Sequence, residues 1–396
     1  MQRDRASERQ ADRLSSVDAL RGAAALGVVL YHTIGPKAQF GPTVLRWMAA
    51  PFLPMIRFGY VGVFLFFVIS GFCIHLSRAR AQSQHRSATS FTAFWKRRMR
   101  RLYPPYLIAL TLYLLIAGFT TKFEATLFYV WDLVLHILML HNLDSHTVYN
   151  INGVFWTLAI EEQLYLAYFL LLFLRNRWGW PRTLLACVLA RVIWFVASTA
   201  IRQRLNIDIP IAEAAASHWF TWALGALSVE AMYGLVQLPA WCYRIRLAFV
   251  TLLASVGLTY LLPFVEAHNR MLHDVLWLIL HPLWGFGFFI LVNFLVVAEK
   301  GWRNKVHTPS VIRYLAIIGV FSYSLYLTHE LVIMEAYQFG FLGFSELATA
   351  VFITTPLTIL FAWLFFRFAE KPYFNTRVSR PEPAHVVPDA VAVVDA

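Results

Sequence analysis

Residues 57–77 read RFGYVGVFLFFVISGFCIHLS, and this stretch decides the fold class. After Arg57, twenty residues carry no Asp, Glu, Lys or Arg, and a helix needs about 20 mostly apolar residues to cross a bilayer. The rest of the chain is similar: 59% of its 396 residues are apolar and 14% are charged, against about 45–50% and 25% in soluble domains. This composition excludes a disordered chain, a collagen-like fibre and a disulfide-stapled secreted scaffold. It predicts an all-α integral membrane protein.

Ten windows of the sequence are long and apolar enough to be membrane spans. They are residues 17–35, 57–77, 101–119, 154–174, 182–201, 215–236, 246–263, 274–297, 311–333 and 346–368. An eleventh run, residues 125–140, is shorter and contains Asp132 and His136. We therefore expect a bundle of about ten transmembrane helices with one short re-entrant or interfacial helix near 125–140.

The distribution of basic residues predicts the topology. The net charge is +12, and Lys and Arg gather at residues 3–13, 78–101, 175–182, 244–246, 300–313 and 367–380. Cytoplasmic loops carry such an excess, so all six clusters are placed in the cytoplasm. Ten spans then leave both termini inside. We expect a cytoplasmic basic lead (1–16), a membrane domain (17–374) and a disordered cytoplasmic tail (375–396).

Ionisable groups inside spans are costly and mark functional sites. In the first span, Arg21 and His32 are 11 residues apart, close to three helical turns, so they share one face about 16 Å apart along the axis. Asp18 precedes them by one turn. The alternative interpretation of this pair is an Arg that snorkels to the interface and a His bonded to a neighbouring helix.

The third span begins with five cations, in the stretch Lys96-Arg97-Arg98-Met99-Arg100-Arg101. Such a cluster often only sets orientation or binds anionic headgroups. However, Arg98 and Arg101 lie at i and i+3, on one helix face. This spacing suits the grip of a phosphate from two sides.

Two further spans place acid and base groups at the depth of His32. In residues 154–174, Glu161 shares a face with Tyr165, and Trp156 starts the stretch. In residues 311–333, Tyr326 and His329 fall in the outer half. The structural alternative for each is a satisfied polar group in a helix interface.

Small residues of the second span favour close helix packing. Gly62 and Gly71 permit a close approach of two backbones, and Ser70 can bond to its own helix. The three cysteines, Cys73, Cys187 and Cys242, show no metal or redox spacing, and we interpret them as small core residues. The sequence shows no metal-ligand spacing, G-x-S-x-G elbow or P-loop. The polar groups together therefore predict an acid/base site, reached by a phosphate-bearing ligand from the arginine-rich side.

These motifs resemble the acyltransferase 3 family of membrane acyltransferases, which includes bacterial O-antigen, exopolysaccharide and Nod-factor O-acetylases. The resemblance covers Leu14 to Phe374. It rests on six elements in order: Arg21 and His32; a GxxFFxxSGF-like helix ending at Phe72; Arg98, Arg101 and Pro104; Trp156, Glu161 and Tyr165; the SYSLYLxH stretch ending at His329; and Glu370-Lys371-Pro372.

The resemblance implies a site and a cofactor. The family transfers an acyl group, usually acetyl from acetyl-CoA, to an acceptor hydroxyl, without a metal. Carried over by position, Arg21, Arg98 and Arg101 hold the phosphates of CoA. His32 is the general base or a transient acyl carrier, and Glu161 orients or protonates it. Asp18, Ser70, Trp156, Tyr165, Tyr326 and His329 bind substrate or support the site.

The leading hypothesis is thus an acyl-CoA-dependent O-acyltransferase of the bacterial inner membrane that acts on a sugar, glycan or other hydroxyl acceptor. Its partners are acyl-CoA, this acceptor and membrane lipids, with no nucleic acid. The alternative is a secondary transporter or lipid-linked sugar flippase, because intramembrane His and Glu also form proton relays. A structural scaffold leaves the polar motifs unexplained.

Overall fold

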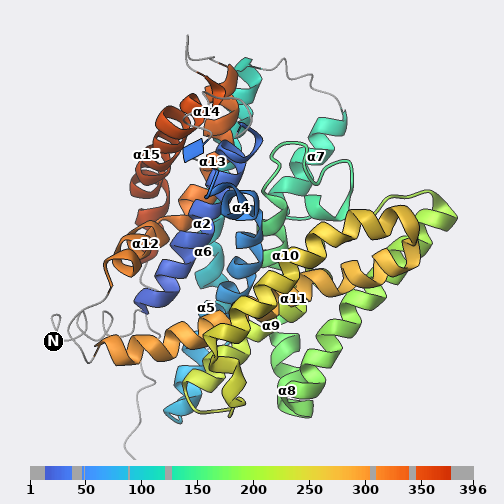
Figure 1. The fold of residues 1–396 in the computed structure, drawn as a ribbon, viewed down its shortest axis with the longest axis vertical. Helices are drawn as coiled ribbons and strands as arrows, with labels where there is room; N and C mark the ends of the chain where they lie inside the picture. Colours follow the sequence, from blue (N-terminus) through green and yellow to red (C-terminus); the bar gives the residue numbers. More distant parts are fainter. Residues whose placement is uncertain are drawn as a thin grey trace, which may run out of the picture.

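The computed structural model describes residues 14–37, 47–48, 50–87, 90–120, 127–303, 309–338 and 345–375. Within these ranges the chain is helical and contains no strand. Most of the predicted lead and tail (1–13 and 376–396) lies outside the described residues. The longer helices are α2 (Ser15–Thr33), α5 (Gly62–Ser83), α6 (Phe91–Thr120), α8 (Trp156–Leu205), α9 (Ala215–Met232), α10 (Ile245–His268), α11 (Arg270–Arg303), α12 (Ser310–Val320), α13 (Ser322–Gln338) and α15 (Thr355–Phe365). Figure 1 shows how they pack side by side.

Shorter elements complete the chain. They are η1 (Gly35–Lys37), α4 (Leu53–Arg57), η2 (Gly59–Val61), α7 (Leu127–Ile137), η3 (His141–Leu143), η4 (Ala240–Tyr243), α14 (Glu346–Thr349), η7 (Lys371–Asn375), and the π-helical η5 (Ala350–Thr354) and η6 (Phe366–Glu370). Helices therefore account for every segment that the sequence predicts to cross the membrane.

Several helices are long and apolar enough to cross a membrane. Among the described residues, five segments qualify: Gly59–Ser83, Trp156–Leu205, Ile245–His268, Arg270–Trp302 and Glu346–Phe374. The pair α12 and α13, bent by 70°, brings the number to six if it forms one span. The prediction of an all-helical, multi-pass membrane protein is confirmed at this level.

The longest segment, α8, consists of two helices. Its 50 residues would extend about 75 Å as one straight helix, more than twice the thickness of a hydrocarbon core of about 30 Å. Gly179 interrupts it with φ 73° and ψ 172°, a conformation that glycine adopts without steric cost. The two arms correspond to the predicted windows 154–174 and 182–201.

The segment near 125–140 forms the short helix α7, whose 11 residues extend only about 16 Å. It is therefore too short to cross the hydrocarbon core. Asp132 and His136 are buried on one face, whereas Leu127, Val130 and Trp131 are exposed on the other. Residues 125–126 lie outside the described part of this window.

Glycines set the close packing around α5. A Cβ on Gly71 would lie 1.9 Å from the Trp222 carbonyl oxygen, and a Cβ on Gly225 would lie 1.8 Å from that of Val68. Only glycine therefore allows α5 and α9 to cross at this distance. On the other side, a Cβ on Gly62 would lie 2.7 Å from the Ala24 oxygen of α2. The packing role predicted for Gly62 and Gly71 agrees with these contacts.

The start of α2 is held by a distant carboxylate. Glu299, near the end of α11, accepts hydrogen bonds from the backbone N–H groups of Ser15 (2.8 Å) and Ser16 (2.9 Å). It also accepts one from the hydroxyl of Ser16 (2.5 Å). A carboxylate at a helix N-terminus satisfies free N–H groups and complements the helix dipole. This contact fixes the helix that carries Arg21 and His32.

Candidate active site

A cavity of about 310 Å³ lies between α2, α5, α6, α8 and α13. Its size suits part of a small-molecule ligand. Seven residues singled out from the sequence line it: Arg21, Ser70, Arg98, Arg101, Glu161, Tyr165 and Tyr326. Along α5 the lining runs from Val63 to Leu76, which corresponds to about 20 Å at 1.5 Å per residue. The cavity is therefore elongated along this helix.

Three arginines gather at one end of the cavity. Arg98 and Arg101 come from α6 and Arg21 from α2, and Arg101 lies in the electrostatic field of the other two. The guanidinium of Arg101 lies 4.5 Å from the ring centre of Phe374. Its buried Nε has no hydrogen-bond partner among the described residues. Glu370 also lies in the electrostatic field of Arg101, but three arginines at one end of the cavity give that end an excess of positive charge, which suits an anion.

Glu161 lies in the wall between this arginine cluster and the opposite end. It accepts a hydrogen bond from the Tyr165 hydroxyl (3.0 Å) and forms one with Ser70, within the field of Arg21 and Arg98. Ser70 in turn accepts one from Nε1 of Trp222 (3.2 Å). Glu161, Ser70 and Tyr165, which the sequence places on two different spans, thus form one hydrogen-bonded group.

The opposite end of the cavity is closed by a tyrosine. Thr157 donates a hydrogen bond to the Tyr326 hydroxyl (2.8 Å), and this hydroxyl donates to the Val154 carbonyl oxygen (3.1 Å). The ring of Tyr326 packs against Phe66, with 5.9 Å between ring centres. Tyr326 and Thr157 are buried. These contacts hold the phenol across the end of the cavity.

A pair of histidines lies behind Tyr326. The ring centres of Tyr326 and His329 are 5.5 Å apart, and those of His329 and His32 are 5.2 Å apart. Nδ1 of His32 lies 3.3 Å from Nε2 of His329. Neither histidine is among the described residues that line the cavity. Tyr326 therefore separates the cavity from the two imidazoles.

The backbone assigns the protons of this pair. His329 Nδ1 lies 2.8 Å from the Tyr326 carbonyl oxygen, and His32 Nδ1 lies 3.1 Å from that of Val28. Because a carbonyl oxygen only accepts, both Nδ1 atoms carry the proton in the neutral rings. His32 Nδ1–H then also points to the lone pair on His329 Nε2. This arrangement leaves Nε2 of His32 as the nitrogen that accepts a proton.

The contacts of the two predicted catalytic residues differ from those expected. Glu161 bonds to Tyr165 and Ser70, whereas the partner of His32 is His329. Asp18 and Trp156 do not line the cavity within the described ranges. The Asp18 carbonyl packs against α12, and the Trp156 ring lies 6.3 Å from that of His218.

Comparison with known sequences identifies the family. A family model described as an acyltransferase domain matches residues 14–367, which is most of the chain. The chain belongs to the acyltransferase 3 family. The resemblance drawn from the six motifs is thereby confirmed.

The curated members of the family that match are longer than this chain. One relative is a Staphylococcus aureus (strain COL) protein that is provisionally named an O-acetyltransferase. It is 25% identical to this chain over 385 residues, and the match covers 91% of this chain and 57% of the relative. The O-acetyltransferase OatA of Staphylococcus aureus (strain NCTC 8325) is 26% identical over 392 residues, with the same coverage. The chain thus spans just over half the length of these relatives. No solved structure matches it significantly.

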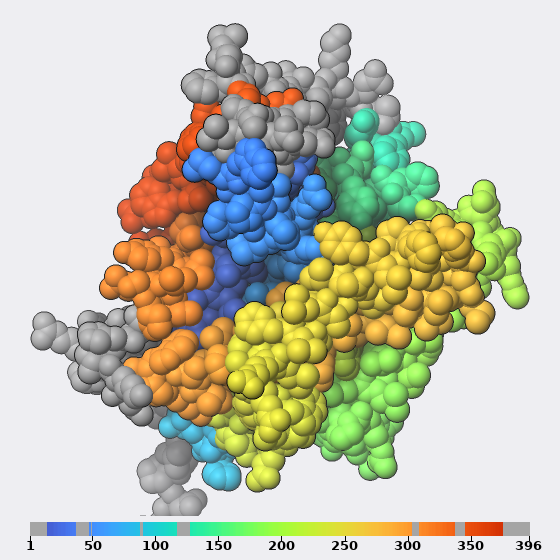
Figure 2. Space-filling view, viewed as in Figure 1, coloured from blue at the N-terminus to red at the C-terminus, as the bar shows by residue number. Residues whose placement is uncertain are grey.

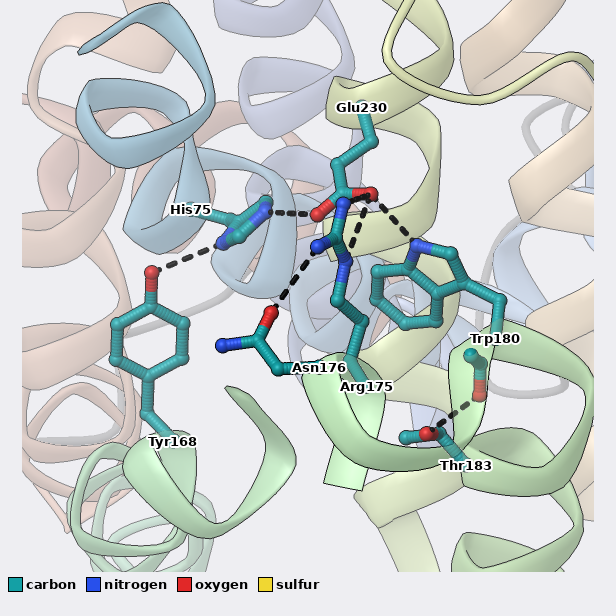
Figure 3. Close-up of polar contacts among 8 residues, drawn as sticks. His75, Tyr168, Arg175, Asn176, Trp180, Thr183 and Glu230 are labelled. Atoms are coloured by element: carbon teal, nitrogen blue, oxygen red, sulfur yellow. Dashed lines mark hydrogen bonds and ion pairs between the residues drawn. The ribbon is translucent and has the colours of Figure 1, made fainter. Parts of the chain in front are cut away.

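A buried network outside the cavity was not predicted (Figure 3). Glu230 of α9 accepts hydrogen bonds from Nε2 of His75 (3.0 Å), Nη2 of Arg175 (2.7 Å) and Nε1 of Trp180 (2.7 Å). Nδ1 of His75 lies 2.9 Å from the Tyr168 hydroxyl. The sequence feature that could have indicated this network is the carboxylate of Glu230, which lies inside the apolar window 215–236. The network joins α5, both arms of α8 and α9.

Metal binding was not expected from the sequence. Among the described residues, no group of three or more His, Cys, Asp or Glu side chains has a geometry that could hold a metal ion.

Proposed function

We propose that this chain is a membrane O-acyltransferase that moves an acetyl group from cytoplasmic acetyl-CoA to a hydroxyl of a sugar or glycan. The observation that carries the proposal is the order of groups along the cavity. An arginine cluster (Arg21, Arg98 and Arg101) stands at one end and Tyr326 closes the other, with His329 and then His32 behind it. A donor with phosphates at one end and a thioester at the other has the matching order.

The donor binds with its phosphates at the arginine cluster. Charge-assisted hydrogen bonds from guanidinium groups to phosphate are strong and directional, and Arg101 Nε is a donor in need of an acceptor. The pantetheine arm then lies along the α5 wall. Glu161 is a positioning residue of this half of the site, where its carboxylate attracts Arg21 and Arg98.

His32 acts as the general base. Nε2 of His32 removes the proton of the acceptor hydroxyl while the oxygen attacks the thioester carbonyl carbon. The C–S bond then breaks, the acetyl group remains on the acceptor oxygen, and the thiolate of CoA takes the proton from the imidazolium. His329 Nε2 accepts from His32 Nδ1–H and so orients the base and stabilises its charged form.

The proposed topology follows from the charge clusters. Ten spans with both termini in the cytoplasm put the arginine cluster near the cytoplasmic face, where CoA is found, and His32 in the outer half of the membrane. The membrane is then the bacterial inner membrane. The helical windows and the two arms of α8 support this arrangement.

Thiol modification tests donor binding without requiring turnover. Cys73 lines the cavity and is partly exposed, whereas Cys187 and Cys242 are buried. The protecting ligand is CoA capped at its sulfur as the S-methyl thioether, because a free CoA thiol would itself consume the maleimide. We expect this capped CoA to slow the modification of Cys73 by N-ethylmaleimide, with Cys73→Ser as the control that identifies the labelled thiol. S-methyl pantetheine, which lacks the phosphates, should protect less. Modification at an unchanged rate under saturating capped CoA would argue against a donor site here.

Thiol release tests the reaction. Purified protein in nanodiscs should release free CoA thiol from acetyl-CoA when alkyl glycosides are added as acceptors, and His32→Gln should abolish the acceptor-dependent part. Absence of release, combined with movement of a labelled sugar across vesicles, would favour the transporter instead.

A further inference from the structure

A hollow lies on one face of the molecule beside α2 (Figure 2). Its floor includes the dark blue segment of α2, and its rim includes the blue residues around α4 and the yellow residues of α10. The donor cavity does not account for this hollow, because residues of α4 and α10 do not line that cavity within the described ranges.

Aromatic rings from α2, residues 58–60, α10 and α11 contact one another near these segments. Tyr31 of α2 lies 5.5 Å from Tyr60, measured between ring centres, and Tyr60 lies 6.1 Å from Phe58. Phe58 contacts Tyr260 of α10 (5.6 Å) and Trp284 of α11 (5.9 Å). We call these five residues the aromatic cluster.

The cluster reaches the proposed base directly. The ring of Tyr31 lies 4.9 Å from that of His32 in an edge-to-face arrangement. His32 is only partly buried, while His329 behind it is fully buried. The imidazole of His32 therefore lies between His329, which contacts Tyr326 at the end of the donor cavity, and Tyr31 of the aromatic cluster.

Glycines bring the cluster to α2. A Cβ on Gly59 would lie 2.0 Å from the Gly27 carbonyl oxygen and 2.9 Å from Cβ of Tyr31. In the sequence Phe58-Gly59-Tyr60, the glycine therefore packs directly against α2 beside Tyr31, and the rings of Phe58 and Tyr60 are stacked on one another.

The cluster also presents polar groups. The Tyr60 hydroxyl is hydrogen-bonded to Thr259 and lies within the electrostatic field of the Tyr31 and Tyr260 hydroxyls. Tyr260 is 62% exposed, and Tyr31 and Tyr60 are partly exposed. Apolar ring faces combined with converging hydroxyls match the two surfaces of a sugar ring, its C–H face and its hydroxyl edge.

We propose that the aromatic cluster is the acceptor site and that its ligand is a sugar carried on a lipid chain; this rests on the proposed function. Tyr and Trp also gather at membrane interfaces, but interfacial anchoring requires no ring-to-ring chain that ends at an imidazole. The reason to include a lipid chain in the ligand is the surface of α10, where Leu261 and Phe264 are exposed beside Tyr260. A carrier chain can lie on this apolar flank while the sugar occupies the cluster.

Photolabelling tests the site independently of catalysis. The probe is octyl β-glucoside with a diazirine on the sugar, bound to the full chain in nanodiscs and mapped by mass spectrometry. We expect labelled peptides from residues 28–33, 57–61 and 258–262. Unlabelled octyl β-glucoside should compete, whereas octyl tetraethylene glycol ether, which has the same chain without a sugar, should not. Labelling elsewhere, or equal competition by the ether, would overturn the acceptor site.

A matched pair of tyrosines supplies the control. Tyr260 and Tyr314 are 62% and 61% exposed, but only Tyr260 belongs to the cluster. Tyr260→Ala should lower labelling of residues 28–33 at least about 5-fold, through loss of one aromatic contact, and Tyr314→Ala should not. Equal labelling in both variants would contradict the proposal.

Two further measurements separate the parts of the inference. Methyl β-glucoside carries the same sugar without a chain, and competition as strong as that of octyl β-glucoside would remove the lipid carrier from the proposal. The protection of Cys73 by capped CoA should be the same in the wild type and in Tyr260→Ala. Loss of labelling with intact CoA protection therefore reports on the acceptor site alone, whereas absence of CoA protection in the wild type would reject the proposed function.

Discussion

Nδ1 of His32 lies 3.3 Å from Nε2 of His329, on a helix almost 300 positions later in the chain. The carbonyl oxygens of Val28 and Tyr326 fix the tautomer of each ring. The base of the proposed reaction is therefore oriented by a second imidazole, while Glu161 serves the donor half of the site.

The first prediction concerns this histidine pair. His32→Gln removes the base and should lower kcat for acetyl transfer about 10²- to 10⁴-fold. His329→Leu should cause a smaller loss, about 10- to 100-fold by analogy with other groups that orient an imidazole. His329→Gln should restore part of the rate, because its amide oxygen can accept from His32 Nδ1–H. Rates of CoA thiol release measure all three.

One outcome would contradict the proposed role of His329 in orienting His32. If His329→Leu and His329→Gln had the same rate, acceptance of a hydrogen bond at this position would not matter. The protection of Cys73 by capped CoA should be unchanged in each variant, which separates an effect on the base from an effect on donor binding.

The second prediction concerns the arginine cluster. Arg101→Gln should raise KM for acetyl-CoA roughly 10- to 100-fold, since a hydrogen bond to a charged group contributes about 1.5–3 kcal/mol. Arg100 is the neighbouring residue on the same helix, but it is exposed, so Arg100→Gln is the matched control. Equal KM values for the two variants would place the phosphates elsewhere.

The third prediction concerns the buried network around Glu230. Glu230→Ala leaves Arg175 and Trp180 without their acceptor and should destabilise the protein by about 3–5 kcal/mol, as does the loss of one partner of a buried ion pair. Glu266, 48% exposed and paired with Arg270, provides the control, because exposed pairs contribute little. Thermal unfolding in detergent measures both. A Tm for Glu230→Ala as high as that for Glu266→Ala would show that the network is dispensable.

The fourth prediction concerns helix packing. Gly225→Ala would bring a methyl group within 1.8 Å of the Val68 oxygen and should force α5 and α9 apart, with loss of folded protein. A Cβ added to Gly257, in α10, would have no atom of a neighbouring segment within 4 Å. Gly257→Ala should therefore be neutral or slightly stabilising, by up to about 1 kcal/mol of helix propensity. Size-exclusion profiles and Tm values compare the two, and equal behaviour would contradict the packing described here.

Much of the fold could be predicted from apolar length alone. Each predicted window forms helix because a stretch without charges must satisfy its backbone internally in a membrane. The break in α8 was predicted, because the basic cluster 175–182 separates the windows 154–174 and 182–201, but its position at Gly179 was not. The 70° bend between α12 and α13 also has no local signal, because Phe321 between them is an ordinary apolar residue.

The candidate site was predicted in part for a related reason. Position along a span gives only an approximate depth. Arg21, Arg98 and Glu161 line one cavity, whereas the sequence placed Glu161 at the depth of His32, away from the arginines. Depth also does not show which residue of a neighbouring helix a side chain faces. His32 was therefore paired with Glu161, although the packing of α2 against α13 brings His329 to it instead.

The hydrogen-bonded phenol of Tyr326 has a consequence for the cell. A catalyst that receives one reactant from each side of a membrane risks forming a pore, through which protons would dissipate the electrochemical gradient. Here the passage from the arginines stops at a side chain tied to Thr157 and to the Val154 carbonyl. In the proposed topology, the phenol of Tyr326 therefore keeps the two compartments apart while the donor cavity is empty.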